Sequence, residues 1–357
     1  MKWNIGWGTI SKCNMNCAFC YSKTRRKEGN DLNFNDWVKF IDENAKNINS
    51  INYGTGENTL SDDWFSLAEH IRKNYPGIRQ SLTTNGHLSV AVRKEENLKK
   101  FIYSIDEVDV SLDFCEAEKH NSFRGQPMAY SWAIDTLSLC KKTQKKATVV
   151  FLGSRINIYE ENIDGLFAIA KQWDAILRMN IYRPVDGINE FTEKFILDRE
   201  RLLNILLYIN AKYNILSIGD AYLSPLLAGT SRPDPSGSIS IRILADGSIT
   251  PSTYLINGMY TVGNIRQKNI LEVLEKEQAL KKVIYAKLPC ECLFCAYKED
   301  CCGGVFDRRY LWNGSLDKKD PYCPGTYSSK IKPVIKICNS DFSSVHDGYL
   351  PTMFFKP

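Results

Sequence analysis

Strand-like and helix-like segments alternate along the first half of this chain, and this alternation limits the folds open to it more than any other feature. Helical periodicity fills the intervals, as in Asp36–Lys46 and in Asp62–Asn74, which follows the capping residue Ser61. Such alternation favours a parallel sheet with helices on its outside, so we expect an α/β fold. The predicted strands are Trp3–Trp7, Ile51–Gly54, Ser81–Thr84, Glu107–Asp113, Thr148–Leu152 and Ile176–Ile181.

Length and composition exclude several classes of protein. A chain of 357 residues exceeds what one hydrophobic core usually serves, so we expect one large domain and a smaller one. Its 46 basic and 41 acidic residues give a diffuse net charge of +5, which argues against nucleic acid as a partner. No apolar run reaches the ~18 residues of a membrane span, and the start lacks a signal-peptide core, so we expect a cytoplasmic protein without membrane contact. Twelve cysteines in a reducing compartment point to metal or redox chemistry.

Three cysteines near the amino terminus, Cys13, Cys17 and Cys20, have the spacing C-x3-C-x2-C. Thiolates are the usual ligands of iron–sulfur clusters, and three of them leave one iron of a four-iron cluster open to a small chelating molecule. A structural zinc usually has four protein ligands and no histidine lies nearby, so zinc, or three buried thiols without metal, is the less favoured interpretation. The spacing therefore indicates a reactive [4Fe–4S] cluster.

This segment resembles the cluster motif of the radical S-adenosylmethionine (SAM) superfamily. The resemblance implies that the open iron binds the amino and carboxylate groups of SAM, and that one-electron reduction cleaves SAM to a 5′-deoxyadenosyl radical. It also implies that Phe19, just before the third cysteine, lies against the adenine of SAM. In this family six strand–helix repeats form a partial (β/α)6 barrel similar to a TIM barrel, and sites in such barrels form at the carboxyl ends of the strands.

The segment Gly54-Thr-Gly-Glu-Asn58 follows the second predicted strand and resembles the family's Gly-Gly-Glu motif. In that motif a backbone carbonyl and the carboxylate hold the amino group of SAM. Gly56 and Glu57 match it, whereas Thr55 replaces the first glycine. Since the backbone does much of the binding, the resemblance implies this role for Gly56 and Glu57 despite the substitution.

Two polar residues, Ser111 and Asp113, occupy alternate positions of the predicted strand Glu107–Asp113 and are expected to face the same side of it. Burying them unpaired would cost about 1–3 kcal/mol each, so they need a ligand or bonds to neighbouring loops. With His120 and Arg124 they resemble the family's S-x-D strand and its H…RG tail. The resemblance implies that Ser111 and Asp113 reach the ribose or the methionine carboxylate of SAM.

Three weaker matches fall on later strands or just after them. Asn85 follows the third strand, Asn157 follows the fifth, and Arg178 lies on the sixth, where this family contacts SAM or substrate. A guanidinium group matches a carboxylate in a two-pronged bond, so Arg178 is predicted to bind the methionine carboxylate. The resemblance covers about the first 185 residues, and their shared register is what supports it.

A different kind of sequence follows the predicted barrel. A long helix is predicted over 191–214, and the Pro-, Gly- and Ser-rich stretch 224–237 then interrupts the pattern. Alternation in 238–250 around Asp246-Gly247 predicts a hairpin, and a short helix is expected near 270–279. We therefore expect three parts: the barrel in 1–230, a small cysteine-rich domain in 231–338 and a tail in 339–357.

The cysteines of the second part resemble the SPASM extension of radical SAM enzymes, which holds auxiliary iron–sulfur clusters. Ser252 and Val305 stand where that extension has cysteine ligands of a first auxiliary cluster, so we expect this cluster to be absent. A four-cysteine zinc site is the alternative at the second position. Cys290 and Cys302 are left over, and each is a candidate ligand in place of a neighbour or a candidate catalytic hydrogen-atom donor. The resemblance implies one auxiliary [4Fe–4S] cluster held by Cys292, Cys295, Cys301 and Cys323.

The tail Ser340–Pro357 carries four aromatic residues around a Gly/Pro kink: Phe342, Tyr349, Phe354 and Phe355. We expect either an arm that packs back onto the barrel, or a segment that closes the cavity or meets a partner peptide. In the second case His346 and Asp347 are its polar contacts.

The resemblance implies an enzyme that abstracts a hydrogen atom from a ribosomally made precursor peptide. The peptide would then be cross-linked, oxidised or shortened, as in the spliceases that excise a tyramine unit. No recognition domain precedes the first strand, so we expect a separate protein to present the leader peptide and a flavodoxin or ferredoxin to supply electrons. The alternatives are a radical SAM dehydrogenase of a small molecule such as an aminosugar, a sulfatase-type protein maturase, and a zinc protein without enzymatic activity.

Overall fold

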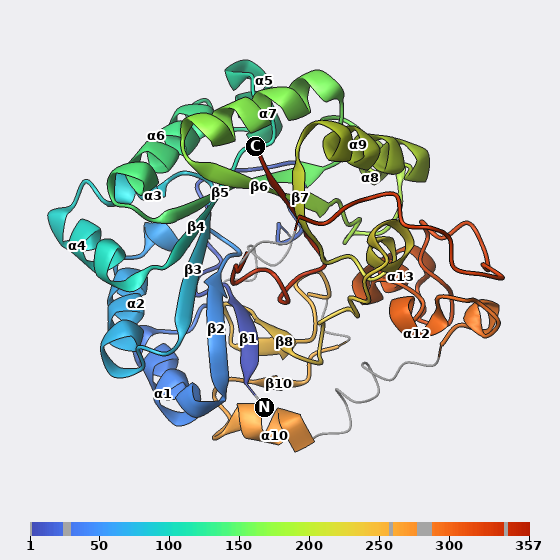
Figure 1. The fold of residues 1–357 in the computed structure, drawn as a ribbon. Coiled ribbons are helices and arrows are strands. Elements are labelled where there is room, and N and C mark those ends of the chain that lie inside the picture. The colour runs from blue at the N-terminus through green and yellow to red at the C-terminus, as the bar shows by residue number, and fades with distance from the viewer. Residues whose placement is uncertain (1, 24–29, 257–259, 277–287, 339–341) are drawn as a thin grey trace.

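One continuous eleven-stranded sheet organises the protein, as a computed structural model shows (Figure 1). The structure describes residues 2–23, 30–256, 260–276, 288–338 and 342–357. The strand order is β10-β9-β8-β1-β2-β3-β4-β5-β6-β11-β7. The strands are β1 (Trp3–Trp7), β2 (Ile48–Tyr53), β3 (Arg79–Thr84), β4 (Glu107–Ser111), β5 (Lys146–Gly153), β6 (Ala175–Ile181), β7 (Asn214–Ile218), β8 (Ser240–Ile243), β9 (Ser248–Thr250), β10 (Gly263–Asn264) and β11 (Met353–Lys356).

Strands β1 to β6 are parallel and adjacent in chain order, and helices cover the outside of the curved sheet (Figure 1). The predicted α/β class with a partial barrel is therefore confirmed. The helices are α1 (Phe34–Asn44), α2 (Asp62–Asn74), α3 (Leu88–Ala91), α4 (Glu95–Ser104), α5 (Ala117–Arg124), α6 (Ala129–Lys142), α7 (Glu160–Gln172), α8 (Glu190–Glu193), α9 (Arg199–Lys212), α10 (Ile270–Lys276), α12 (Lys298–Cys301) and α13 (Phe306–Asn313).

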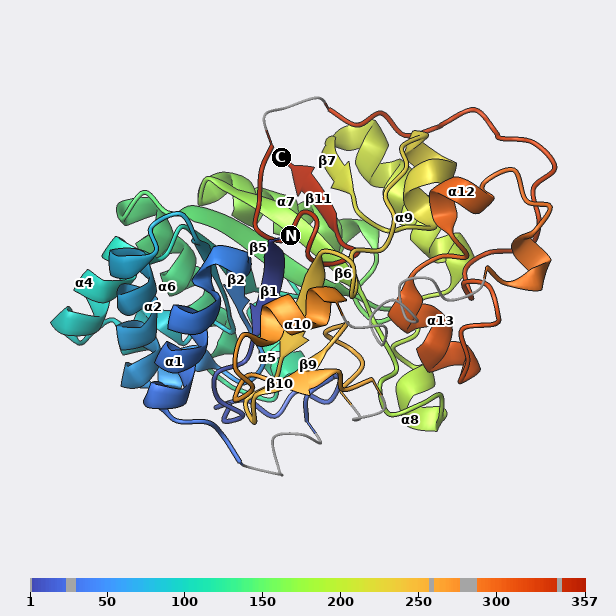
Figure 2. The same ribbon diagram turned by 90° about the horizontal axis from the view of Figure 1, so that it is seen from below.

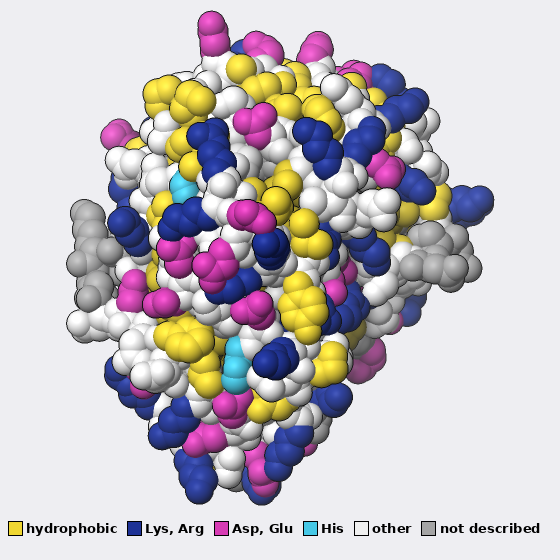
Figure 3. Space-filling model, turned by 90° about the vertical axis from the view of Figure 1, so that its left-hand side faces the viewer, with side chains coloured by type: hydrophobic (Ala, Val, Ile, Leu, Met, Phe, Trp, Pro, Cys, Tyr) yellow, Lys and Arg dark blue, Asp and Glu magenta, His cyan; other side chains and the backbone are white. Residues whose placement is uncertain are grey.

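The apolar face of each outer helix closes the core, as α1 illustrates. Asn33 and Asp36 form a capping box at its start. Trp37, Phe40 and Ile41 are then buried, and the ring of Phe40 meets that of Trp7 on β1 edge-on. The opposite faces of these helices are charged. On the side of the molecule that carries α2 and α4, Lys and Arg side chains alternate with Asp and Glu (Figure 3). Within the described residues no helix has the length and apolarity that crossing a membrane requires.

The single helix predicted over 191–214 is wrong, because the structure has α8 and α9 with a bend between them. Asp198 ends the continuous pattern: its side chain accepts a hydrogen bond from the backbone N–H of Arg201 and caps α9. In the bend, Phe195 and Leu197 turn into the core. The predicted hairpin is confirmed as β8 and β9, and α10 forms where a short helix was expected, with 277–279 outside the described residues.

The tail forms β11, which lies between β6 and β7 and is antiparallel to both (Figures 1 and 2). Before it, the chain passes the amino ends of the barrel strands, where the backbone N–H of Val345 donates to Glu107, the first residue of β4. His346 is fully buried inside the barrel, with Nδ1 2.7 Å from Oδ2 of Asp109. The tail thus packs inside the barrel, and β8 joins β1, so one sheet runs through all three expected parts; their boundaries at 230 and 338 remain predictions.

Candidate functional site

A cavity of about 980 Å³, including its open mouth, lies at the carboxyl ends of the barrel strands. It brings together the cluster motif and several of the residues predicted to bind SAM. Phe19 lies on its wall, with one ring face stacked on Phe123 at 4.1 Å between centroids. Seven of the predicted residues line the cavity: Cys13, Cys17, Cys20, Phe19, Gly56, Asn85 and Ser111.

The three amino-terminal thiols lie on one loop that the rest of the barrel braces. The N–H of Cys20 donates to the carbonyl of Cys17, closing a turn, and Nδ2 of Asn85 lies 3.7 Å from Sγ of Cys13. Burial raises the pKa of Cys17 to about 11, and the guanidinium of Arg124 only partly offsets this. Binding of a cluster therefore displaces protons. Three soft thiol donors that face one cavity from a single loop fit an iron–sulfur cluster with one open iron.

Glu57 lies beside the cavity but points into the protein. Its carboxylate accepts hydrogen bonds from the backbone N–H of Asn85 at 2.8 Å and from the hydroxyls of Thr59 and Thr84. Burial raises the pKa of Glu57 against the effect of these bonds. Gly56 has φ +65°, and a Cβ there would lie 2.3 Å from the carbonyl oxygen of Ile10, so only glycine fits. Glu57 therefore fixes the loop, while the backbone at Gly56 faces the cavity.

Ser111 and Asp113 do not share a strand face, because β4 ends at Ser111. Ser111 lines the cavity, whereas Asp113 is completely buried and forms an ion pair of 2.6 Å with Arg124. The backbone N–H of Leu152 also donates to Asp113. The expectation that Asp113 needs a ligand or a partner is met by these bonds within the chain. Arg124 itself lines the cavity and lies over the ring of Phe19, 5.2 Å from its centroid.

Asn157 and Arg178 are likewise held by the protein and do not line the cavity. The side chain of Asn157 accepts from Ser154 and donates to the carbonyl of Asp113, so it braces two loops. Arg178 is buried in the middle of β6 and lies 3.3 Å from Asp109. Arg178 thus lies outside the lining of the cavity, and its contact with the methionine carboxylate stays a prediction.

The cavity has a second wall that the sequence did not reveal. Tyr182 and Arg183 directly follow β6, and Tyr254 reaches the cavity from beyond the hairpin. The guanidinium of Arg183 lies 5.5 Å from the ring centroid of Tyr254 and pairs with Asp307 at 2.8 Å. Arg183 is the second residue after β6, as Asp113 is the second residue after β4, and this correspondence is a signal that the sequence contains.

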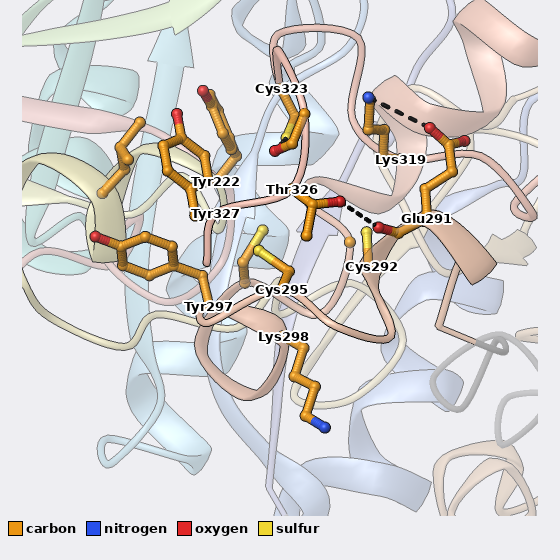
Figure 4. Close-up of a pocket in the computed structure, with 14 residues that line it drawn as sticks. Tyr222, Glu291, Cys292, Cys295, Tyr297, Lys298, Lys319, Cys323, Thr326 and Tyr327 are labelled. Carbon is orange, nitrogen blue, oxygen red and sulfur yellow. Dashed lines mark hydrogen bonds and ion pairs between the residues drawn. The ribbon is translucent and has the colours of Figure 1, made fainter. Parts of the chain in front are cut away.

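The cysteine-rich region contains a second cavity of about 460 Å³ (Figure 4). Burial raises the pKa of Cys292 to about 11 and also raises that of Cys301. Cys290 and Cys302 are exposed and do not line this cavity. No set of three or more Cys, His, Asp or Glu side chains in the described part of the chain is arranged around a single metal ion. The four cysteines predicted to hold the auxiliary cluster all line the cavity: Cys292, Cys295, Cys301 and Cys323.

Ser252 and Val305, the two residues that stand at predicted cysteine positions of the SPASM pattern, are both buried. The hydroxyl of Ser252 donates to Asp307 at 2.6 Å, and the same carboxylate pairs with Arg183. Val305 is completely buried. Serine and valine thus have structural partners where the SPASM pattern has cysteines.

Residues 8–166 match the family model described as the radical SAM superfamily. Together with the thiol loop and the barrel, this match defines residues 8–166 as a radical SAM domain, the part of such iron–sulfur enzymes that binds a [4Fe–4S] cluster and SAM.

Among its relatives is the mycofactocin maturase MftC of Mycolicibacterium smegmatis, which is 23% identical over 348 residues, 92% of this chain and 86% of that protein. The AdoMet-dependent heme synthase of Methanosarcina barkeri is 24% identical over 343 residues, 89% of this chain and 95% of that protein. The structure of SuiB from Streptococcus suis bound to SAM superimposes with a TM-score of 0.68 at 17% identity, covering 90% of this chain and 76% of that one. This similarity shows that the fold is shared.

Proposed function

We propose that this enzyme abstracts a hydrogen atom from a ribosomally made precursor peptide and thereby modifies it. The observation that carries the proposal is the cavity that joins the three thiols to a separate wall formed by Tyr182, Arg183 and Tyr254. The three thiols and these side chains border the same open cavity, so a second ligand beside SAM would contact this wall. MftC, named a maturase, matches most of the chain, and SuiB has been solved bound to its precursor peptide SuiA.

In this proposal Cys13, Cys17 and Cys20 hold the cluster. When bound, the cluster and SAM supply one-electron chemistry and a 5′-deoxyadenosyl radical. Phe19, Asn85 and Ser111 contact SAM, and the backbone at Gly56 receives its amino group, because all four residues line the cavity. Glu57, Asp113 and Asn157 do not contact SAM in this proposal. They hold the loops of the cavity wall in place through hydrogen bonds to the backbone. The walls of the cavity shield the reacting carbon from water.

The second cavity is proposed to hold one auxiliary [4Fe–4S] cluster with four thiolate ligands. Its sulfur-rich lining supports this, because Cys292, Cys295, Cys301 and Cys323 border one space. Four thiolates supply one ligand to each iron, so Cys290 and Cys302 are not needed as ligands. A cluster with no vacant iron suits electron transfer. We infer that a flavodoxin or ferredoxin supplies electrons, that a separate protein presents the leader peptide, and that the enzyme works in the reducing cytoplasm.

Anaerobic reconstitution with iron and sulfide tests both sites at once. We expect about eight irons per chain from two four-iron clusters. The Cys13, Cys17 and Cys20 to serine triple variant should bind about four irons and form no deoxyadenosine with SAM and dithionite. The Cys292→Ser/Cys295→Ser variant should also bind about four irons but still form deoxyadenosine. Cys338→Ser is the matched control, because that thiol lines neither cavity, and it should behave like the wild type.

The substrate class is decided by deuterium transfer. With a precursor peptide deuterated at the reacting residue, we expect deuterium in deoxyadenosine. The similarity to a heme synthase makes an iron porphyrin the competing substrate. Deuterium transfer from a porphyrin but from no peptide encoded near this gene would refute the peptide proposal while leaving the radical chemistry intact.

A further inference from the structure

Thr55, the residue that replaces glycine in the Gly54–Glu57 loop, has an unusual backbone conformation. Its φ is +82°, in the left-handed region that glycine enters freely and that a β-branched residue strongly disfavours. The residue also lines the cavity beside Gly56. A strained residue in a binding loop persists only where its surroundings hold it in place. The contacts of its side chain are therefore the feature to explain.

The hydroxyl of Thr55 is shared by two side chains from other parts of the chain. The hydroxyl of Tyr21, the residue after the third cysteine of the cluster loop, lies 2.8 Å from Oγ1 of Thr55. Nη2 of Arg242, on β8, donates to the same oxygen and to the carbonyl of Gly54. A glycine at position 55 would offer neither bond. The hydroxyl thus ties the loop to the cluster segment and to the hairpin strand.

The side chain of Arg242 reaches the loop by passing beside a glycine of the neighbouring strand. β8 pairs with β1, where Gly6 lies opposite Arg242, and a Cβ on Gly6 would lie 2.8 Å from Nη1 of Arg242. The side chain of Arg242 is only 1% exposed, its Nε has no partner, and no described carboxylate forms an ion pair with it. A buried guanidinium is costly without hydrogen bonds, so its bonds to Gly54 and Thr55 are its main compensation within the described structure.

We propose that Thr55 serves as an attachment point through which Tyr21 and Arg242 position the Gly54–Glu57 loop for SAM. The inference rests on the proposed role of this loop in binding SAM. Arg242 and Tyr21 are positioning residues, because they act on the loop and not on the reacting atoms. The strain at Thr55 is offset by three bonds that fix the direction of the neighbouring backbone. A freer glycine loop would have to lose this freedom on each binding event.

The test compares Thr55→Val, Thr55→Ser, Arg242→Met and Arg242→Lys with the wild type, all reconstituted anaerobically. The affinity for SAM is measured by isothermal titration, and chelation of the open iron by the change in the EPR spectrum of the reduced cluster on adding SAM. Valine keeps the shape of threonine without the hydroxyl, so we expect its Kd for SAM to rise about tenfold, and serine to retain an affinity within about twofold. Arg242→Met should raise Kd at least tenfold and Arg242→Lys should recover part of the loss.

A merely structural role would lower the iron content and melting temperature and leave the affinity of the loaded fraction unchanged. We expect the opposite: iron content near the wild-type value, with a weaker EPR response at limiting SAM. Thr352→Val is the matched control, since Thr352 is a buried threonine whose hydroxyl donates to the carbonyl of Met179 and does not line the cavity. It should change Kd by less than about twofold.

The outcomes separate this inference from the proposed function. If the wild type binds SAM and Thr55→Val and Arg242→Met bind it equally well, the positioning role is wrong and the function stands. If the wild type itself neither binds SAM nor forms deoxyadenosine, the proposed function fails first. If Arg242→Met does not fold, the comparison of Thr55→Val with Thr55→Ser still tests the positioning role. Valine lacks only the hydroxyl of threonine, and serine lacks only its methyl group.

Discussion

Replacing Arg308 by methionine should destabilise the protein strongly and loosen the loop that carries Cys323. The guanidinium of Arg308 is completely buried between two carboxylates and lies 2.6 Å from both Asp220 and Asp320. Burial alone would raise the pKa of Asp220, but Arg308 outweighs it and holds that pKa below the ordinary value. Asp320 also accepts hydrogen bonds from the backbone N–H groups of Val305 and Tyr322, so it fixes the backbone directly before Cys323.

The magnitude follows from what the substitution leaves behind. Removing one partner of a buried ion pair typically costs about 3–5 kcal/mol, because the remaining charge is uncompensated. Here two carboxylates are left, yet each retains two backbone N–H donors: Tyr222 and Leu223 for Asp220, Val305 and Tyr322 for Asp320. We therefore expect a loss of about 3–5 kcal/mol and not the sum of two such losses. At about 1.3 °C per kcal/mol for a chain of 357 residues, the melting temperature should fall by about 4–7 °C.

Thermal unfolding of the cluster-free protein at pH 7.5 measures this loss, and iron analysis after reconstitution measures the effect on the second cavity. The matched control is Lys94→Met, since Lys94 is 66% exposed and its pair with Asp62 should contribute about 0–1 kcal/mol. Neutralising both carboxylates in Arg308→Met/Asp220→Asn/Asp320→Asn should restore at least half of the lost stability. A single variant that loses less than 1 kcal/mol, or a triple variant no better than the single one, would refute the reasoning.

Three further predictions concern the tail and the cavity. Burial, assisted by Arg178, lowers the pKa of His346 despite the opposing effect of Asp109; the unfolded chain therefore binds the proton more readily, so stability present above about pH 6.5 is lost as the pH falls below it. His346→Gln should show a smaller fall in melting temperature between pH 7.5 and 5 than the wild type, and equal slopes would contradict this. Phe354→Ala removes a fully buried ring from β11 and should cost about 3–5 kcal/mol in thermal unfolding, whereas the exposed Lys356→Ala should stay within about 0.5 kcal/mol; similar losses would count against the tail as an integral strand. Gly56→Ala should raise the Kd for SAM at least tenfold, because its Cβ meets the carbonyl of Ile10, while Gly77→Ala has open space and should bind SAM normally; retained affinity in Gly56→Ala would show that the loop does not approach SAM.

The core strands could be predicted because their apolar runs are local signals, but the depth of a side chain along a barrel strand could not. Arg178 and Asn180 are two residues apart on β6, so their side chains point to the same side of the strand. Only Asn180 lines the cavity. Two strand residues span about 7 Å, and this step places Arg178 beside Asp109 inside the barrel. In the same way, Asp113 lies past the end of β4, where Arg124 reaches it first.

The pairing of strands that lie far apart in the chain is the second feature that the sequence does not reveal. Met353 pairs with both Met179 and Ile218, and nothing within the short segment Met353–Lys356 reveals these partners. The helix predicted over 191–214 is wrong for a related reason: the apolar periodicity continues through the bend, and only the cap formed by Asp198 marks the start of a second helix.

Two adjacent residues of α13 connect the two proposed cluster sites. Asp307 pairs with Arg183 on the wall of the barrel cavity, while Arg308 pairs with Asp320 beside the loop of Cys323. Both ion pairs are buried, and both start from the same short helix. Ser252, which stands where the SPASM pattern has a cysteine, donates a hydrogen bond to the same Asp307 carboxylate. Buried ion pairs from two consecutive residues of one helix thus join the wall of the barrel cavity to the cysteine-rich region.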